Sequence, residues 1–293
     1  MVKKIQKYHK ESESPFYKLR TKARLAKILF IGKPKLKSLC GPQKKYHSFT
    51  KTKKDGGKRL IDAPQDDLKA AQSRIAQLLQ RITPPDFLFA PVAGRSYVDN
   101  AAVHIGARSV RLLDIKDFFP SCTANKVIWF FRTRMGCSDD IAVMLKEIVT
   151  LNSSLPQGSP CSPILAYLCY VDMWREVEIL VSNSQCRLSV YADDITISGQ
   201  IIPEKMIWRI KETLYRHGHR YHLEKERSHV NRPSKVTGVI LTRNGLKLPN
   251  CQHQKIFQIK KQIRATRSLK EQSRLEMQLR GRIAQKNQVI EAS

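Results

Sequence analysis

The chain has 293 residues, with 53 Lys/Arg against 25 Asp/Glu and a formal net charge of +28 at pH 7. This length allows one large domain or two smaller ones with a real buried core. The charge far exceeds what solubility requires and indicates a polyanionic partner. The seven cysteines form no CxxC pair, so the pattern excludes a zinc site of that kind and favours reduced thiols.

The positive charge lies mainly at the two ends of the chain. Residues 1–60 carry 19 Lys/Arg and 3 acidic residues, and residues 251–293 carry 10 and 3. This distribution predicts two surfaces that grip nucleic acid around a nearly balanced catalytic body. A basic membrane-binding surface is the alternative, and it is disfavoured because no amphipathic helix with an aromatic face stands out.

No membrane association or secretion is expected. The opening "MVKKIQKYHK" leads into polar sequence rather than into the apolar region of a signal peptide. The most apolar stretch, residues 163–174, is too short to cross a bilayer and contains Asp172. These features predict a soluble, cytoplasmic protein.

The first part of the chain predicts helices and one hairpin. In chain order, the patterns predict a basic leader over 1–50 with a short helix at 25–32, a hairpin over 51–62, an amphipathic helix over 66–85 and a strand over 109–115. Asp66 is the expected cap of the amphipathic helix, and the Pro84–Pro85 pair its stop.

The second part mixes strands and helices without a strict alternation. The patterns predict helices over 124–135 and 139–150, a proline-punctuated loop over 155–163, one long buried helix to about 181, a strand–turn–strand over 186–198, a helix over 203–217, short strands near 236–248 and a basic helical tail from about 253. Such a mixture is typical of the α+β class.

Two adjacent carboxylates stand out in "SVYADDITISG", residues 189–199. Asp193 and Asp194 repel each other unless a positive charge sits between them, although a polar hairpin turn is the simpler reading. Asp114 ends another apolar run and is the natural third member. Hard cations such as Mg²⁺ prefer oxygen ligands, and a metal pair about 4 Å apart clamps both oxygens of a phosphoryl transfer. The three carboxylates therefore predict a site for two Mg²⁺ ions.

Several motifs carry a resemblance to a known family. "LLDIKDFFP" (112–120), "LPQGSPCSP" (155–163) and "YADD" (191–194), in this order, resemble the palm motifs of reverse transcriptases, and "KKDGGKR" (53–59) resembles their fingers. "NAAVH" (100–104) and "VTG" (236–238) resemble the NAxxH and VTG elements of bacterial retron reverse transcriptases. The resemblance covers roughly residues 50–250.

The resemblance implies a right-hand polymerase fold with fingers, palm and helical thumb. It divides the chain into a basic leader over 1–50, fingers with the NAxxH element over 51–108, a palm with interleaved fingers helices over 109–235, and the VTG element with a basic thumb over 236–293. Asp114, Asp193 and Asp194 become the catalytic metal ligands.

The same resemblance assigns further residues. Phe119 would exclude a ribose 2′-OH, with Phe118 as the alternative, and Gln157 and Gly158 would line the incoming nucleotide. The candidates for gripping its triphosphate are Lys53, Lys54, Lys58 and Arg59, with Arg59 preferred because guanidinium binds phosphate bidentately. RNA recognition would involve Asn100, His104, Val236, Thr237 and Gly238. Without the family, His104 reads more simply as a structural histidine.

The group that protonates the leaving pyrophosphate stays open. The family commonly shows a lysine after the second palm helix, whereas "LEKERSHV" (223–230) places Arg227 there and Lys225 two residues earlier. Arginine does not easily give up a proton. Either Lys225 serves, or the step is less assisted.

The resemblance implies an RNA-directed DNA polymerase that copies part of a cognate structured non-coding RNA into a branched RNA–DNA hybrid (msDNA). Synthesis would use deoxynucleoside triphosphates, start from a guanosine 2′-OH and serve anti-phage defence, with an effector protein as a further partner. No aspartate follows Asp194, so a separate ribonuclease H is expected. The rivals are a reverse transcriptase of an intron-encoded or diversity-generating group, an RNA-binding scaffold with a vestigial centre, and an RNA-copying RNA polymerase, which Phe119 disfavours.

Overall fold

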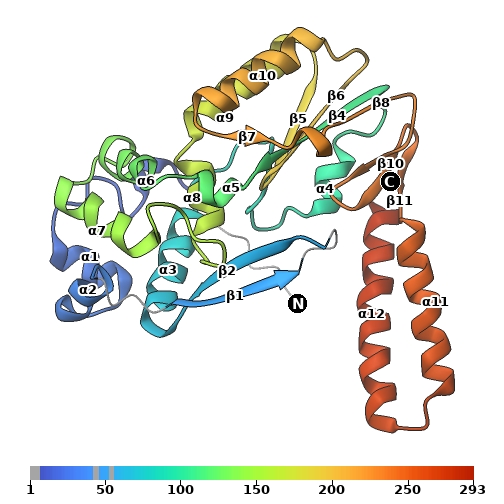
Figure 1. Ribbon diagram of the computed structural model, residues 1–293, viewed down its shortest axis with the longest axis horizontal. Coiled ribbons are helices and arrows are strands. Elements are labelled where there is room, and N and C mark those ends of the chain that lie inside the picture. The colour runs from blue at the N-terminus through green and yellow to red at the C-terminus, as the bar shows by residue number, and fades with distance from the viewer. Residues whose placement is uncertain (1–6, 42–45, 53–55) are drawn as a thin grey trace.

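The computed structural model describes residues 7–41, 46–52 and 56–293. Figure 1 shows a central twisted sheet, a group of helices with a β-hairpin on one side, and a long helical hairpin that projects on the other side. The predicted α+β class is confirmed, with the layout of a right-hand polymerase: fingers, palm and helical thumb.

The palm is a mixed sheet built from strands that are far apart in the sequence. Its strands are β3 (Leu88–Ala90), β4 (Ser109–Lys116), β5 (Arg187–Tyr191), β6 (Asp194–Gly199), β7 (Arg220–Tyr221) and β8 (Arg227–Val230). The order is β3-β5-β6-β4, and β7 and β8 both pair with the remaining edge of β4. β3 runs parallel to β5, and the other pairs are antiparallel.

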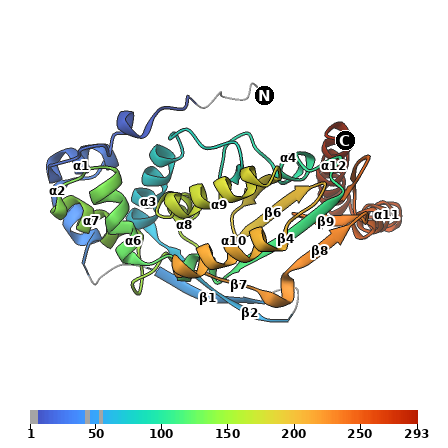
Figure 2. The ribbon, with the colours of Figure 1, turned by 90° about the horizontal axis from the view of Figure 1, so that it is seen from above.

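The two faces of the palm sheet have different surroundings. Successive residues of a strand point to opposite faces, and Leu113 and Ile115 of β4 enter the main hydrophobic core. On that face lie α9 (Val171–Asn183) and α10 (Glu204–Arg216), side by side over the sheet (Figure 2). We call this the covered face. Asp114 lies on the other side, the open face, where it lines a cavity together with residues 58–60 and 62. Figure 1 shows the hairpin of β1 (Tyr46–Thr52) and β2 (Lys58–Pro64) beside the sheet.

The fingers contain most of the remaining elements. They are η1 (Glu11–Glu13), α1 (Lys22–Leu29), α2 (Lys33–Leu39), β1 (Tyr46–Thr52), β2 (Lys58–Pro64), α3 (Asp66–Leu79), α5 (Phe118–Ser121), α6 (Ala124–Trp129), the π-helical η2 (Phe130–Arg134), α7 (Asp139–Val149) and α8 (Ser162–Leu168). The N-terminal segment contributes Phe16, Leu19 and Leu25 to the main core. Its packed part is therefore integral to the fingers, and the predicted boundary at residue 50 falls inside β1.

Three details differ from the sequence prediction. The amphipathic helix exists as α3, but Gln65 is its N-cap and Asp66 is its first residue. The single long helix predicted to 181 is α8 followed by α9, because Tyr170 has non-helical backbone angles. The hydroxyl of Tyr170 donates to the carbonyl of Ser121 and accepts from the amide of Thr123, which fixes this break. The helix predicted over 124–135 continues after α6 as η2.

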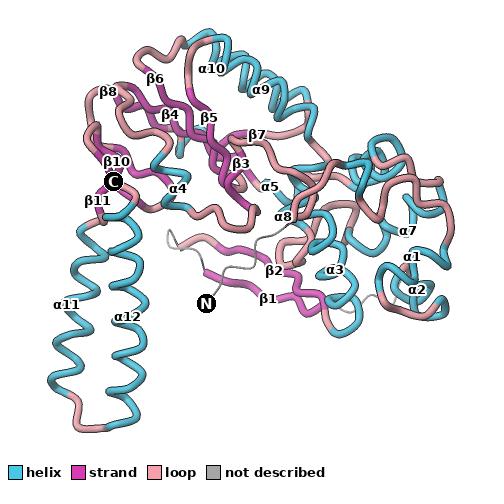
Figure 3. Tube along the Cα trace, turned by 180° about the vertical axis from the view of Figure 1, so that it is seen from behind, coloured by secondary structure: helices cyan, strands magenta, loops and turns pink. Residues whose placement is uncertain are grey.

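A second, smaller core joins the thumb to the palm. A three-stranded sheet of β9 (Ser234–Val236), β10 (Val239–Thr242) and β11 (Gly245–Lys247) packs with α4 (Tyr97–Ala102). Val98, Val236, Val239 and Val289 are all buried there. The predicted basic tail is a pair of antiparallel helices, α11 (Asn250–Ala265) and α12 (Leu269–Glu291), which Figure 3 shows extending from this sheet.

Within the described ranges, no helix has both the length and the apolar character needed to cross a bilayer.

Candidate active site

The three predicted carboxylates are carried to one place by strand register. β4 and β6 are antiparallel neighbours, and Asp114 lies directly opposite Asp194. Tyr191 pairs with Asp194, so the predicted turn consists of Ala192 and Asp193, and Asp194 is the first residue of β6 rather than part of the turn. Ala192 has a φ of 57°, a left-handed conformation that is costly for a residue with a side chain. The amide of Ile115 donates to the carbonyl of Asp193 at 3.0 Å and ties the turn to β4.

A cavity of about 410 Å³ lies between this end of the palm and the fingers. The sequence-predicted residues that line it are Lys58, Arg59, Asp114, Phe119, Gln157 and Asp193, together with Lys225. Its walls come from β2, β4, the loop before α8 and the turn between β5 and β6. Residues separated by more than 130 positions in the sequence therefore meet around one space that is rich in charge.

The carboxylates are in an environment that disfavours their negative charges. Burial and the charges of Asp193 and Asp114 raise the pKa of Asp194 to about 7. Burial, followed by the charge of Asp114, also raises the pKa of Asp193. Lys225 acts in the opposite direction on both groups. A divalent cation would remove this electrostatic cost, and oxygen donors suit a hard ion such as Mg²⁺.

The carboxylate of Asp114 forms an ion pair with a lysine. The Nζ atom of Lys225 donates to its Oδ1 atom at 2.8 Å, and the Nε2 atom of His222 lies 3.8 Å from the same oxygen. Across the described part of the chain, no three His, Cys, Asp or Glu side chains are grouped closely enough to hold a metal ion. Binding an ion through all three carboxylates therefore requires their side chains to move closer together, and Lys225 competes with the ion for Oδ1 of Asp114.

Two neighbouring aromatic residues have different positions. Phe118 is buried in the main core, and Phe119 is half-buried at its edge, although both reach the cavity. Their rings are 5.6 Å apart. Phe119 is thus the more available of the two for a contact with a nucleotide sugar.

The loop before α8 docks on the fingers hairpin through its backbone. The carbonyl of Gln157 accepts from the amide of Asp62 at 2.8 Å. Gly158 has a φ of +134°, and a Cβ atom there would lie 2.7 Å from the carbonyl oxygen of Asp62. Gly158 therefore permits this close approach to β2, and Gln157 lines the cavity. Contact of either residue with a nucleotide stays a prediction.

The candidate triphosphate ligands divide into two pairs. Lys58 and Arg59 begin β2 and face the cavity. The other two candidates, Lys53 and Lys54, lie outside the described residues. A guanidinium and an ammonium group at the cavity mouth are suited to a triphosphate.

The NAxxH and VTG elements contact each other across the second core. The Nδ2 atom of Asn100 donates to the Oγ1 atom of Thr237 at 3.4 Å, and Thr237 donates to the carbonyl of Tyr97 at 2.8 Å. Asn100 and Val236 are fully buried. Gly238 is exposed and has a φ of +96°.

His104 is also fully buried, against β5 and β6 of the palm. Its ring nitrogens lie 2.7 Å from the hydroxyls of Ser198 and Ser189. Burial, followed by the charge of Arg187, lowers the pKa of His104 to about 3, so its ring is neutral. The part of His104, Asn100 and Val236 in RNA recognition stays a prediction, and their burial places them behind the surface of the two elements. Val103 and Gly238 are the exposed residues of these elements.

An ion-pair network on the covered face was not predicted. It joins Arg111 of β4 and Glu226 before β8 to Glu204 and Lys211 of α10. The alternating pattern of β4 could have shown that Arg111 points toward the core side of the sheet. Its partners are more than 90 residues away in the sequence, and no local spacing identifies them.

Comparison with known proteins agrees with this geometry. The family model described as "Reverse transcriptase (RNA-dependent DNA polymerase)" matches residues 51–241. The curated relatives include the Retron Se72 reverse transcriptase of Salmonella heidelberg (strain 579083-10), 35% identical over 53% of this chain and 41% of that protein. They also include the Retron Ec86 reverse transcriptase of Escherichia coli, 34% identical over 53% and 49%. The Retron Mx162 reverse transcriptase of Myxococcus xanthus is 29% identical over 70% and 48%.

Among solved structures, the chain is similar to the foamy viral protease–reverse transcriptase in complex with double-stranded DNA. The TM-score is 0.46 and the identity 17%, over 81% of this chain and 35% of that one. A second structure of this viral protein, with an RNA/DNA hybrid, gives a TM-score of 0.43, 19% identity, and coverage of 73% and 25%. At these values the likeness carries no argument of its own.

The chain belongs to the reverse transcriptase family, since the family model covers well over half of it. The predicted resemblance to bacterial retron reverse transcriptases is confirmed by its curated relatives. The chain spans about half the length of these relatives or less. Enzymes of this family generally use divalent metal ions.

Proposed function

We propose that this chain is an RNA-directed DNA polymerase of the retron type. The observation that carries the proposal is the convergence of Asp114, Asp193 and Asp194 at one end of β4 and β6, opposite Lys58 and Arg59 of the fingers. Two Mg²⁺ ions held by these carboxylates would supply Lewis-acid stabilisation of the charge that develops during phosphoryl transfer. The raised pKa values of Asp193 and Asp194 support this role, because a bound cation offsets their repulsion.

The remaining cavity residues contact different parts of the incoming deoxynucleoside triphosphate. Lys58 and Arg59 hold the triphosphate, and Arg59 can do so bidentately. Phe119 closes the space that a ribose 2′-OH would need, and Gln157 lines the nucleotide. Gly158 keeps the loop carrying Gln157 against β2.

Lys225 is better placed than Arg227 to protonate the leaving pyrophosphate. Lys225 lines the cavity and reaches Asp114. The guanidinium of Arg227 donates to the backbone carbonyls of Glu224 and Glu226, and it does not line the cavity. An ammonium group also gives up a proton more readily than a guanidinium.

The retron assignment implies a specific RNA and a branched product. We infer that the chain copies part of a cognate structured non-coding RNA into msDNA, primed from a guanosine 2′-OH, in the cytoplasm and in the service of anti-phage defence. A separate ribonuclease H and an effector protein would be its partners. The identity of the curated relatives supports this inference, as does the contact between Asn100 of the NAxxH element and Thr237 of the VTG element.

Sequencing the nucleic acid that copurifies with the protein tests the proposal. We expect RNA and DNA that stay joined under denaturing conditions and separate after treatment with a debranching enzyme. A protein that extends ordinary primers but never yields a branched product with its neighbouring RNA is a reverse transcriptase of another bacterial group. A protein that binds RNA but extends no primer is a scaffold.

A further inference from the structure

The edge of β4 is interrupted at the catalytic aspartate. β8 pairs with Ser109–Leu112 of β4, and β7 pairs with Ile115–Lys116. Between these two pairings the chain bulges out over residues 222–226, where η3 (Leu223–Lys225) forms a single turn. The amide of His222 donates to the carbonyl of Asp114 at 2.8 Å, so this bulge begins directly beside the aspartate.

Consecutive residues of the bulge turn to opposite faces of the sheet. The side chain of Lys225 reaches Asp114 on the open face, although half of it is exposed. The side chain of Glu226 points to the covered face, where it is 12% exposed. Glu226, whose side chain is buried on the covered face, is thus the sequence neighbour of Lys225, which contacts Asp114 on the open face.

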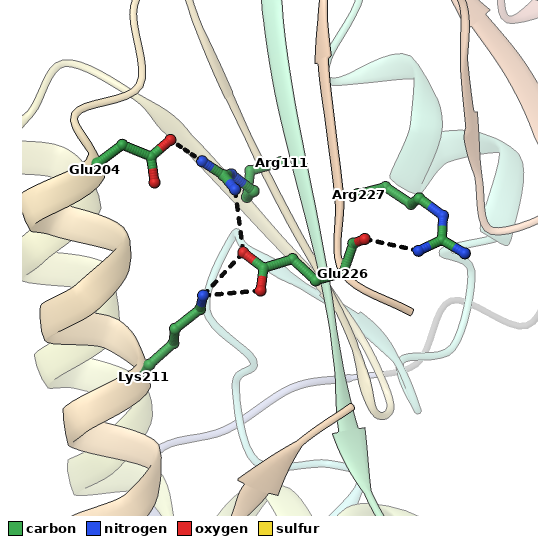
Figure 4. A network of polar contacts seen from close by, with 5 residues as sticks. All are labelled: Arg111, Glu204, Lys211, Glu226 and Arg227. Carbon is green, nitrogen blue, oxygen red and sulfur yellow. Dashed lines mark hydrogen bonds and ion pairs between the residues drawn. The ribbon is translucent and has the colours of Figure 1, made fainter. Parts of the chain in front are cut away.

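Glu226 is held by two cations from two different elements (Figure 4). Lys211 of α10 donates to both of its carboxylate oxygens, at 2.9 and 2.8 Å. Arg111 of β4 donates to one of them at 3.1 Å and is itself only 11% exposed. Charge-assisted hydrogen bonds of this kind are stronger and more directional than those between neutral groups. Glu226 therefore fixes the end of the bulge to both β4 and α10.

The backbone of the bulge is fixed as well. The guanidinium of Arg227 donates to the carbonyls of Glu224 and Glu226. The amides of Lys225 and Glu226 donate to the carbonyl of His222, each at 3.2 Å. The Lys225 side chain extends from this fixed backbone, is half exposed and contacts Asp114.

We propose that Glu226 is a positioning residue that keeps Lys225 within reach of Asp114. In the absence of a metal ion, Lys225 then serves as the counter-ion of Asp114, and a divalent cation must compete with it for that carboxylate. The inference rests on the proposed polymerase site. The inference goes beyond the proposed function because it assigns a role to an ion pair on the covered face of the sheet.

Manganese binding tests this role without nucleic acid or turnover. Mn²⁺ binding to the full chain is measured by electron paramagnetic resonance for the wild type, Lys225→Met, Glu226→Gln and the double variant. An exposed ion pair contributes modestly, so Lys225→Met should tighten Mn²⁺ binding roughly two- to fivefold. Glu226→Gln should shift the affinity in the same direction, and the double variant should bind no more tightly than Lys225→Met alone, because Glu226 acts through Lys225.

Glu204→Gln is the matched control. This substitution removes a carboxylate that also pairs with Arg111. Glu204 is the first residue of α10 and is not part of the bulge. We expect this variant to bind Mn²⁺ as the wild type does. If Glu226→Gln fails to fold, as judged by circular dichroism, Lys211→Met removes one of the two anchoring cations and should tighten binding in the same direction.

Two results would overturn the proposal: an unchanged Mn²⁺ affinity in folded Glu226→Gln or Lys211→Met, or effects of Lys225→Met and Glu226→Gln that simply add. Primer extension by the wild type, measured in parallel, reports on the proposed function separately. A wild type that extends no primer contradicts that function, whereas the Mn²⁺ cycle decides the role of Glu226.

Discussion

Asn100 and Thr237 are 137 positions apart and share a hydrogen bond of 3.4 Å in the second core. This contact ties α4 to the sheet from which the thumb hairpin extends. The two short elements that suggested the retron type are therefore parts of one structural unit. A substitution in either element is expected to affect the same function.

Substitution of the VTG turn should separate cognate synthesis from general synthesis. Thr237→Ala removes the hydroxyl that bonds Tyr97 and Asn100, and Gly238→Ala forces a side chain into a left-handed conformation. We expect each change to lower the yield of branched product several-fold while primer extension on a generic RNA template stays near the wild-type rate. Gel analysis before and after debranching measures both. Equal loss in the two assays would show that the turn serves folding alone.

Asp193→Asn should abolish polymerisation. Loss of one carboxylate at a two-metal site is expected to cost about three orders of magnitude in rate, or roughly 4 kcal/mol of barrier. Single-nucleotide incorporation on a primed RNA template measures it, with RNA affinity as the test of intact folding. Asp172→Asn, on α9, is the control that should keep full activity. Near-normal synthesis by Asp193→Asn would remove this residue from the site.

The same variant should be more stable than the wild type in the absence of metal. The folded-state pKa of Asp193 is raised by burial and by Asp114, so its ionised form is costly at pH 8. Removing the charge should raise the melting temperature in the presence of a chelator, and added Mg²⁺ should reduce the difference by stabilising the wild type. This opposite effect on stability and activity is typical of a strained catalytic site.

Phe119→Val should relax the choice of sugar. The ring lies at the edge of the cavity, and its removal opens space for a 2′-OH. We expect incorporation of ribonucleotides to increase relative to deoxynucleotides by about tenfold or more, since a steric block is worth at least 1.4 kcal/mol. Competition between the two triphosphates measures the ratio. Phe118→Val should instead lower stability, because Phe118 is buried; unchanged selectivity in Phe119→Val would move attention to Phe118.

The thumb hairpin should contribute to salt-dependent RNA binding. Lys260 and Lys261 are exposed on α11, and each phosphate neutralised adds about 0.7 to 0.9 to the log–log salt slope. The pair Lys260→Gln/Lys261→Gln should therefore reduce the slope by between one and two units. Lys205→Gln/Arg209→Gln, on the outer surface of α10, is the matched control. Deleting 251–293 is a poorer test, because Val289 is buried in the second core.

His104 should make the protein less stable in mild acid. Its folded-state pKa is about 3, against about 6.5 when unfolded, so only the unfolded chain gains a proton between these values. The free energy of unfolding should accordingly fall by about 2 kcal/mol from pH 7 to pH 5 on account of this residue. Urea unfolding at pH 7 and pH 5 should show a smaller fall in the free energy of unfolding for His104→Gln than for the wild type. His253→Gln, on the exposed thumb, should show the same fall as the wild type.

The sequence predicted the palm because its chemistry lies in contiguous motifs. Asp114 lies near the end of β4, Asp193 is in the turn between β5 and β6, and Asp194 begins β6, so their convergence needs only strand pairing. The break between α8 and α9 was not predictable in the same way. It depends on Tyr170, whose hydroxyl contacts lie on the separate segment Ser121–Thr123.

The roles of the side chains behind the site also depended on tertiary structure. The motif marked Asn100 and His104 in the sequence, but it could not show that serines of β5 and β6 contact the ring of the histidine. Glu226 lies next to Lys225 in the sequence, yet its function becomes visible only with Arg111 and Lys211 in place. Long-range ion pairs leave no periodic signal.

Both ends of the α11–α12 hairpin are attached to the sheet of β9, β10 and β11, and its tip near residues 265–269 projects away from it (Figure 3). The hairpin is an arm that is attached at its base. It is about 24 Å long, from the 16 residues of α11 at 1.5 Å each. A rotation of about 10° at the base would carry the tip roughly 4 Å. Under the proposed function, such a rotation would let the thumb follow duplexes of different width without any displacement of the carboxylates on β4 and β6.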